Sequence, residues 1–299
     1  MSTPVNPTLF FEFFIVGLIL ASIYSLMATG LTLIYSILRV VNFAYGEIYM
    51  LGGYAFYFMT TLFGAPTILG LPVAALTGFA ASLLLERLIV KDIYNRNIDR
   101  PTEYVVLGTF AVTIFLQNFA ILLFGPFLKT TPPLVEGKLS LPTFSISYDR
   151  IIAMIVALTT LASLYLFIKK TWAGRAWLAV AQNREGAKII GINVERVGMV
   201  SFGVAGALGA LAGGVLTPVY GVYPTVGTTP LVIGFVIIVI GGLGSIKGSL
   251  IGGVIVGLVQ SLISGLAAPV YGEMTLWIIL LLCLLVRPSG LFGERIREV

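Results

Sequence analysis

Three polar residues stand where two long apolar stretches meet. Asn42, Tyr45 and Glu47 place an amide, a phenol and a carboxylate close together in a sequence that is otherwise apolar on both sides. Polar groups at membrane depth are costly, and they usually face a cavity or a partner. We therefore predict that this segment lines a polar path through a membrane or its gate, with Arg39 within pairing reach of Glu47. The alternative is a short solvated turn that joins two helices.

Two further features interrupt apolar sequence. Gln117 and Asn118 fall within the apolar stretch 105–124, where uncharged amides bind a polar solute or join helices by hydrogen bonds. We assign both to the candidate pathway and favour the helix-joining role. The short apolar stretch 229–243 ends in glycines, and broken helices are tolerated only where their backbone is buried in protein or lines a wet cavity. The glycines assigned to the pathway are Gly241, Gly242 and Gly244.

The sequence of residues 30–57 shows a weak internal repeat in residues 234–257. Each has a glycine, an apolar stretch, a polar or glycine-rich break, and a second apolar stretch with a glycine pair. In this comparison the break at 42–47 corresponds to the one at 241–245. Transporters built from repeats show such paired breaks near their pathway. The weak repeat therefore predicts that both breaks belong to the transport pathway.

The most basic segment of the chain is 169–196. It carries six of the eighteen Lys and Arg residues and lies between long apolar stretches. Asn183 is placed to cap a short helix, Glu185 would lie in its first turn, and Gly191 would end it. A short polar helix on the membrane face suits a partner's groove, whereas a loop that only sets topology is the alternative. The residues assigned to this contact are Arg184, Glu185, Gly186, Lys188 and Gly191.

No residue pattern indicates an enzyme. The chain has no His, and its single Cys, Cys283, lies in an apolar run, so an internal disulfide is excluded and a zinc or haem site is not expected. Lys247 lacks the preceding glycine that a phosphate-binding loop requires. We predict no catalytic residue, no metal and no cofactor held by this chain. The net charge of +5 is attributed to orientation signals rather than to nucleic-acid binding.

Composition sets the fold class. Of the 299 residues 58% are hydrophobic and only 10% are charged, whereas soluble domains carry about 25% charged residues. Because a spanning helix takes about 20 apolar residues, the sequence predicts an all-α polytopic membrane protein of roughly eight to ten spans, some broken or re-entrant, in one domain, 1–299. The first apolar stretch is too long for one simple span and contains Gly30. The stretches fall at about 9–37, 48–64, 68–86, 104–127, 151–168, 197–217, 229–243, 249–268 and 274–286.

Basic loops indicate the orientation. Lys and Arg gather in 87–103, in 169–196 and in the tail from Arg287, and the positive-inside rule places all three in the cytoplasm. The loop 128–150 is poorer in basic residues and is placed outside. We predict about nine crossings, an exterior N-terminus and a cytoplasmic C-terminus. The N-terminus lacks the basic start of a secretory signal, so we expect the first span to be retained.

Four motifs occur in order along nearly the whole chain. They are VNFAYGE at 41–47, AQNREGA at 181–187, GGLGS at 241–245 and RPSGLFG at 287–293. In this order they resemble the membrane permease family of ABC importers for branched-chain amino acids, a group that also includes the urea permeases. The family usually has His where Tyr45 stands, so this chain lacks an imidazole at that position.

The resemblance implies a set of partners. A type II-like permease of this kind pairs in the membrane with a homologous second permease subunit, two cytoplasmic ABC ATPases bind beneath the pair, and an exterior binding protein delivers solute. By this likeness the segment 184–192 is the coupling helix that contacts an ATPase, and ATP and Mg²⁺ are bound by the partner chains. The expected location is the inner (plasma) membrane of a bacterium.

The function expected from the resemblance is ATP-driven import of branched-chain or other small neutral amino acids by alternating access. A permease for urea or a short amide is the alternative within the family. A secondary transporter or channel driven by an ion gradient is the alternative from another class. Ion coupling usually needs acids within spans, and the acids of this sequence are expected almost wholly in loops or at helix ends.

Overall fold

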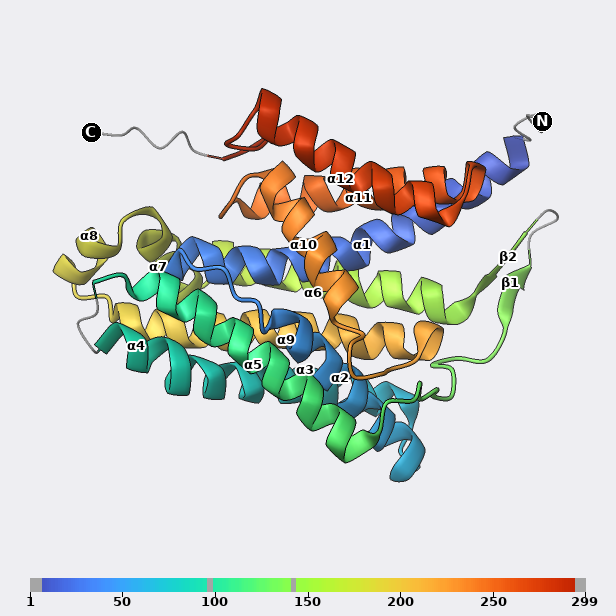
Figure 1. Cartoon of the computed structure of the whole chain (residues 1–299), viewed down its shortest axis with the longest axis horizontal. Coiled ribbons are helices and arrows are strands. Elements are labelled where there is room, and N and C mark those ends of the chain that lie inside the picture. Colours follow the sequence, from blue (N-terminus) through green and yellow to red (C-terminus); the bar gives the residue numbers. More distant parts are fainter. Residues whose placement is uncertain (1–6, 96–98, 141–143, 294–299) are drawn as a thin grey trace.

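The computed structural model describes residues 7–95, 99–140 and 144–293. Long helices run side by side along the longest axis of the molecule (Figure 1). Seven of the helices in the described residues are long and apolar enough to cross a membrane. They are α1 (Pro7–Leu38), α3 (Thr67–Leu85) with its continuation η2 (Glu86–Val90) and α4 (Lys91–Asn95), α5 (Pro101–Phe124), α6 (Tyr148–Lys170), α9 (Val194–Tyr220), α11 (Ile246–Leu266) and α12 (Pro269–Val286).

The other two apolar stretches form shorter helices. These are α2 (Tyr45–Tyr57), which continues into the π-helix η1 (Phe58–Leu62), and α10 (Thr228–Gly241). The 14 residues of α10 rise about 21 Å, less than the roughly 30 Å of a bilayer core. All nine stretches are therefore helical, and the predicted all-α polytopic fold with shortened helices is confirmed.

The first apolar stretch does not break at Gly30. Helix α1 is continuous over 32 residues. The side chain of Tyr45 from α2 and the Ala205 carbonyl of α9 lie against Gly30, where any larger side chain would collide with them. The glycine therefore serves close packing between helices rather than a kink.

Small residues also bring α9 close to α3. Gly206 and Ala210 lie against Gly78, and Gly214 lies against Ala74. The four-residue spacing of the small side chains on α9 places them on one face of the helix, which lets the two backbones approach closely in lipid. Helix α9 is consequently the most buried of the long helices.

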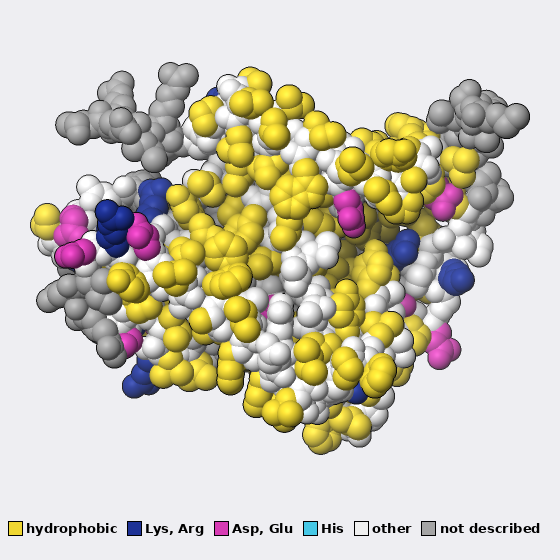
Figure 2. All heavy atoms as spheres, viewed as in Figure 1, with side chains coloured by type: hydrophobic (Ala, Val, Ile, Leu, Met, Phe, Trp, Pro, Cys, Tyr) yellow, Lys and Arg dark blue, Asp and Glu magenta, His cyan; other side chains and the backbone are white. Residues whose placement is uncertain are grey.

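The two ends of the molecule differ in their segments. At one end lie α4 and the short helices α7 (Trp172–Gln182) and α8 (Arg184–Ile189); at the other lie the antiparallel strands β1 (Lys138–Ser140) and β2 (Ser145–Ser147) (Figure 1). Hydrophobic side chains cover most of the central surface, and charged side chains lie mainly towards the ends (Figure 2). This distribution suits a membrane normal that runs along the long axis.

The predicted basic segments share one end. Lys91 of α4 pairs with Glu195 at the start of α9, with 3.3 Å between Nζ and Oε2. The segment that follows α12 also lies there, because Phe292 donates its amide to the Gly241 carbonyl at the end of α10. The basic residues Arg96, Arg295 and Arg297 lie outside the described residues.

Candidate functional site

Helix α2 begins inside the bundle rather than at its edge. After α1 ends, the chain turns at Arg39 (φ 56°) and runs back along the bundle before α2 starts (Figure 1). The Phe43 amide donates to Thr109 Oγ1 at 3.3 Å. Thr109 lies eight residues after the start of α5, which is about 12 Å along that helix. The break is therefore at membrane depth, and the alternative of a solvated turn is wrong.

Helix α10 begins at the same place. Helix α9 ends at Tyr220, and the following residues return into the bundle until Gly227 contacts Gly46. A Cβ on Gly46 would lie only 2.7 Å from the Gly227 carbonyl oxygen. The N-terminal ends of two short helices thus converge, and each end carries partial positive charge. We name residues 42–47 and 223–228 the helix-break junction.

A buried hydrogen bond crosses from this junction to α5. Gln117 donates from Nε2 to Glu47 Oε1 at 2.8 Å. Asn42 Oδ1 accepts from the Ala44 amide at 3.0 Å and so shapes the turn before α2. Glu47 Oε2 and Asn42 Nδ2 have no partner among the described residues, although both side chains are 1% exposed. The junction is therefore tightly enclosed and only partly satisfied.

Two sequence expectations about charges change here. Arg39 does not pair with Glu47; its guanidinium donates instead to the Ala181 carbonyl, at 3.5 Å. Glu47, in the first turn of α2, is buried within the bundle and is thus an exception among acids that the sequence placed almost wholly in loops or at helix ends. The reason is the return of the chain after α1, which carries α2 and its first turn inward. Gln117 joins α5 to α2, which is the helix-joining role favoured for it.

Tyr45 and Asn118 have different surroundings. Tyr45 is fully buried, and its hydroxyl donates to the Ala205 carbonyl of α9 at 3.1 Å. Its ring packs against glycines of α1 and α9. Asn118 is exposed on α5 and donates to the Ile114 carbonyl of its own helix at 2.8 Å. Tyr45 therefore belongs with the junction, whereas Asn118 faces away from it.

The predicted pathway glycines form a turn at the end of the bundle. Gly242 and Gly244 have φ values of 104° and 85°, which favour glycine. Leu291 donates to the Ile240 carbonyl at 2.8 Å and thereby holds the C-terminal segment on this turn. Gly241 packs directly against Gly248 of α11. The segment that meets 42–47 in space is 223–228, and the two breaks at 42–47 and 241–245 lie in different parts of the bundle.

The short helix α8 forms as its sequence predicted. Asn183 Oδ1 accepts from the Gly186 amide at 2.8 Å, and Lys188 pairs with Glu185 of the first turn at 3.2 Å. Gly191, with φ 85°, ends the helix, and the next amide donates back to the Ala187 carbonyl at 3.0 Å. Both ends are therefore fixed by local chemistry.

The exposed surface of α8 adds residues that the sequence did not single out. Ile189 and Ile190 are 84% and 72% exposed at its end. Arg184 lies over the Tyr94 ring of α4, 5.7 Å from its centroid. An apolar pair beside charged side chains on a protruding helix is a surface suited to a protein partner. Two consecutive isoleucines after a capped polar turn were the signal that could have found them.

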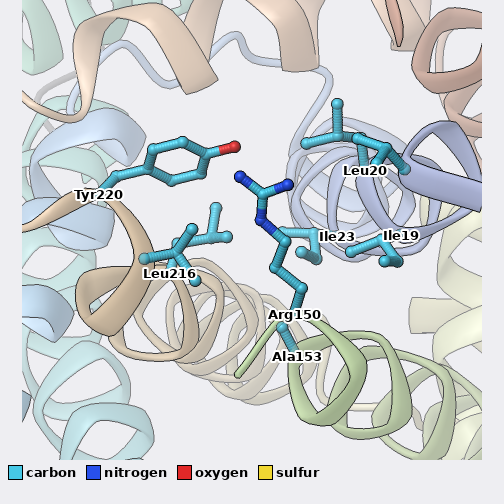
Figure 3. Close-up of a pocket in the computed structure, with 9 residues that line it drawn as sticks. Ile19, Leu20, Ile23, Arg150, Ala153, Leu216 and Tyr220 are labelled. Carbon is cyan, nitrogen blue, oxygen red and sulfur yellow. The ribbon is translucent and has the colours of Figure 1, made fainter. Parts of the chain in front are cut away.

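Two cavities lie at opposite ends of the α1–α6 pair. The larger, about 560 Å³, lies at the α8 end between α1, α6, α7 and the turn before α11. The smaller, about 10 Å³, lies at the other end between α1, α6 and α9 (Figure 3). The larger cavity has mainly aliphatic walls with a few polar groups, among them Thr29, Ser36, Gln182, Gly244 and Ser245. Of these two cavities, the one at the α8 end is therefore much the larger.

Comparison with known proteins identifies the family. The family described as "Branched-chain amino acid transport system / permease component" matches residues 13–286, from α1 to the end of α12. The chain belongs to this permease family. It is a multi-pass membrane protein and a transport permease subunit.

Curated relatives cover almost the whole permease. BraD, a high-affinity branched-chain amino acid transport system permease protein of Pseudomonas aeruginosa, is 30% identical over 292 residues, which are 93% of this chain and 94% of that protein. LivH of Salmonella typhimurium, a permease protein of the same description, is 33% identical over 293 residues, with the same coverage. A probable LivH permease of Methanocaldococcus jannaschii is 31% identical over 288 residues, 93% of this chain and 90% of that protein.

Proposed function

We propose that this permease imports branched-chain amino acids as one membrane subunit of an ATP-driven transporter. Its partners are a homologous second permease subunit, two ABC ATPases that bind ATP and Mg²⁺, and an exterior binding protein. In the inner membrane, α8 and the C-terminus face the cytoplasm and the β1–β2 loop faces outside. The relatives' names support the solute and the system, and the gathering of basic segments at the α8 end supports the orientation.

The observation that carries the transport mechanism is the unequal pair of cavities along α1 and α6. The open one, about 560 Å³, falls within the roughly 300–1,000 Å³ of small-molecule pockets. At the opposite end the pocket between α1, α6 and α9 has about 10 Å³, enough for about one water molecule. A path open towards the cytoplasm and closed outside is one of the two states that alternating access requires.

The walls of the open cavity favour an aliphatic solute. Leu33, Leu161 and Leu164 contribute to them, and hydroxyl and amide groups lie between. An aliphatic wall gains free energy by burying a branched side chain, at roughly 25 cal/mol per Å² of apolar surface. Urea has no apolar surface to bury in such a cavity. The walls therefore favour a branched-chain amino acid over urea.

Helix α8 is the element that connects this cavity to an ATPase. Asn183 joins α8 directly to α7, and Trp177 of α7 packs against Phe167 of α6 with 5.3 Å between ring centroids. Trp177 also lines the open cavity. A displacement of α8 by a partner would therefore move a wall of the cavity. The residues proposed for the ATPase contact are Arg184, Glu185, Gly186, Lys188 and Gly191, together with the exposed isoleucines.

Reconstitution tests the proposal. The permease is placed in vesicles with its sister subunit, the ATPases and the binding protein, and uptake of labelled leucine is measured with and without ATP. Uptake that needs both ATP and the ATPases supports the assignment. Leucine accumulation by the permease alone under an ion gradient would instead favour a secondary transporter, for which the buried Glu47 is the acid to test. ATP-driven uptake of urea but not of leucine would refute the solute.

A further inference from the structure

Arg150 is a cation with an unusual environment. It lies in the first turn of α6, where the partial positive charge of a helix start disfavours a basic side chain. Figure 3 shows the side chain rising from α6 into the space between α1 and α9, with its guanidinium directed towards the hydroxyl of Tyr220. The rest of the pocket is aliphatic and includes Ile19, Ile23 and Leu216. The side chain thus points between helices rather than out to the membrane surface.

None of the described acids lies within ion-pair distance of Arg150. The adjacent Asp149 is engaged elsewhere, because its Oδ1 accepts from the Leu134 amide at 2.7 Å and its Oδ2 accepts from Ser147 Oγ at 3.2 Å. No ion pair among the described residues includes Arg150. Arg150 is partly exposed, and an unpaired cation that lies against aliphatic walls with incomplete hydration is costly. An anionic group that entered the pocket would relieve that cost.

We infer that Arg150 receives the carboxylate of the amino acid when the outer end of the path opens. The inference rests on the proposed function and adds the residue that recognises the solute's anionic group. Guanidinium is suited to this task because it binds a carboxylate through two parallel hydrogen bonds. Tyr220, at the last position of α9, supplies a hydroxyl beside it.

The present geometry explains why the site is closed. With about 10 Å³ of space, the pocket admits about one water molecule and no carboxylate. Tyr220 is followed by Gly221, whose φ of 73° marks the sharp turn that ends α9. Separation of the end of α9 from α1 opens the pocket to the outside. Arg150 then contacts solute before it passes along α6 to the large cavity.

Three substitutions of one residue test the inference in the complete transporter. Arg150→Gln and Arg150→Met remove the charge. Arg150→Lys keeps the charge but cannot form the two parallel hydrogen bonds of a guanidinium. Lys138→Gln, in the exposed strand β1 at the same end, is the matched control. The measurements are leucine uptake at saturating loaded binding protein, ATP hydrolysis in the same vesicles, co-purification of the ATPases, and the melting temperature of the complex.

The expected result is a split between transport and hydrolysis. Leucine uptake falls roughly 10- to 100-fold in the Gln and Met variants, as expected when one charge-assisted contact is lost. Hydrolysis and co-purification stay within about two-fold of the unaltered transporter, so uptake per ATP falls. The Lys variant keeps an intermediate rate, and the Lys138 control is unchanged. Because the Met variant removes an unpaired charge, its melting temperature does not fall.

Other outcomes overturn the inference. Unchanged leucine uptake in Arg150→Gln would show that the carboxylate does not depend on this residue. Loss of co-purification or a lower melting temperature in both the Gln and Met variants would show that Arg150 is a structural anchor. If the unaltered transporter imports no branched-chain amino acid, the proposed function fails before any variant is compared, which separates the two failures.

Discussion

Replacing Gln117 by leucine tests whether the hydrogen bond to Glu47 holds α5 against α2. The bond is 2.8 Å long, and Glu47 is 1% exposed with its second oxygen already unpartnered. Gln117→Leu therefore leaves the whole carboxyl group buried without a protein donor. Such a loss costs about 1–3 kcal/mol, while hydrogen bonds between membrane helices average about 0.6 and reach about 1.7 kcal/mol. We expect a destabilisation of about 1–2 kcal/mol from the overlap of these ranges.

The second half of the test removes the acid. Glu47→Met deletes both the bonded and the unpartnered oxygen, and replacing both partners of a buried pair by apolar groups is nearly neutral. We therefore expect Gln117→Leu to cost almost nothing when Met already stands at position 47. Asn118→Leu is the matched control, because this exposed amide bonds only within its own helix. Its effect should stay within about 0.5 kcal/mol.

The measurement is reversible unfolding of the purified permease in mixed micelles, followed by circular dichroism, for the four combinations of the two positions. The two costs of Gln117→Leu, with and without Glu47, form a double-mutant cycle. Independent sites agree within about 0.5 kcal/mol. Equal costs in the two backgrounds would therefore refute the claim that this bond joins α5 to the junction.

Three other predictions concern the coupling surface, the junction and the cavity. Arg184→Glu with Lys188→Glu should abolish co-purification of the ATPases and ATP-driven uptake, because the partly exposed Arg184 and the exposed Lys188 of α8 reverse their charge; retention of both would contradict the docking assignment. Gly227→Ala should lower stability to unfolding by about 1–3 kcal/mol, because its Cβ would press on the backbone of α2. The control Gly198→Ala, with its nearest neighbour at 3.5 Å, should be neutral or stabilising by up to about 1 kcal/mol. Leu161→Trp should fill part of the open cavity and cut leucine uptake several-fold while the ATPases still co-purify; full uptake would place the path elsewhere.

Features fixed by near neighbours in sequence were predictable. The cap at Asn183 and the end at Gly191 depend on bonds that span only a few residues, so the bounds of α8 follow from residue types. Apolar stretches likewise located the membrane helices, because an apolar stretch of about 20 residues has the length of a helix that crosses the bilayer. Both predictions need no knowledge of the rest of the fold.

The junction was only half predictable. The segment around Asn42 was recognised by its polar residues, but of the glycine-containing segments 241–245 was singled out and 223–228, which meets Gly46, was not. A glycine cluster serves equally as a tight turn or as a close approach of helices, and residue types alone do not distinguish them. Gly221, Pro224 and Gly227 were a comparable signal. The choice between the two segments depends on which one tertiary packing brings against Gly46, and contacts so distant in sequence are not encoded locally.

The junction has the properties that a moving part of the bundle needs. Its two helices approach most closely at the backbones of Gly46 and Gly227. Beside this point the Phe43 ring packs against Phe235 of α10, with 5.3 Å between ring centroids. Glu47 Oε2 and Asn42 Nδ2 are buried without partners among the described residues, and each such group raises the free energy of this state by about 1–3 kcal/mol. An arrangement in which these atoms have partners or water avoids that cost. Nucleotide and solute, by binding one arrangement more tightly than the other, supply enough free energy to shift the population between them. Because α1 contacts Tyr45 of α2 at Gly30 and packs against α6, a shift at the junction also moves the helix that lines both cavities.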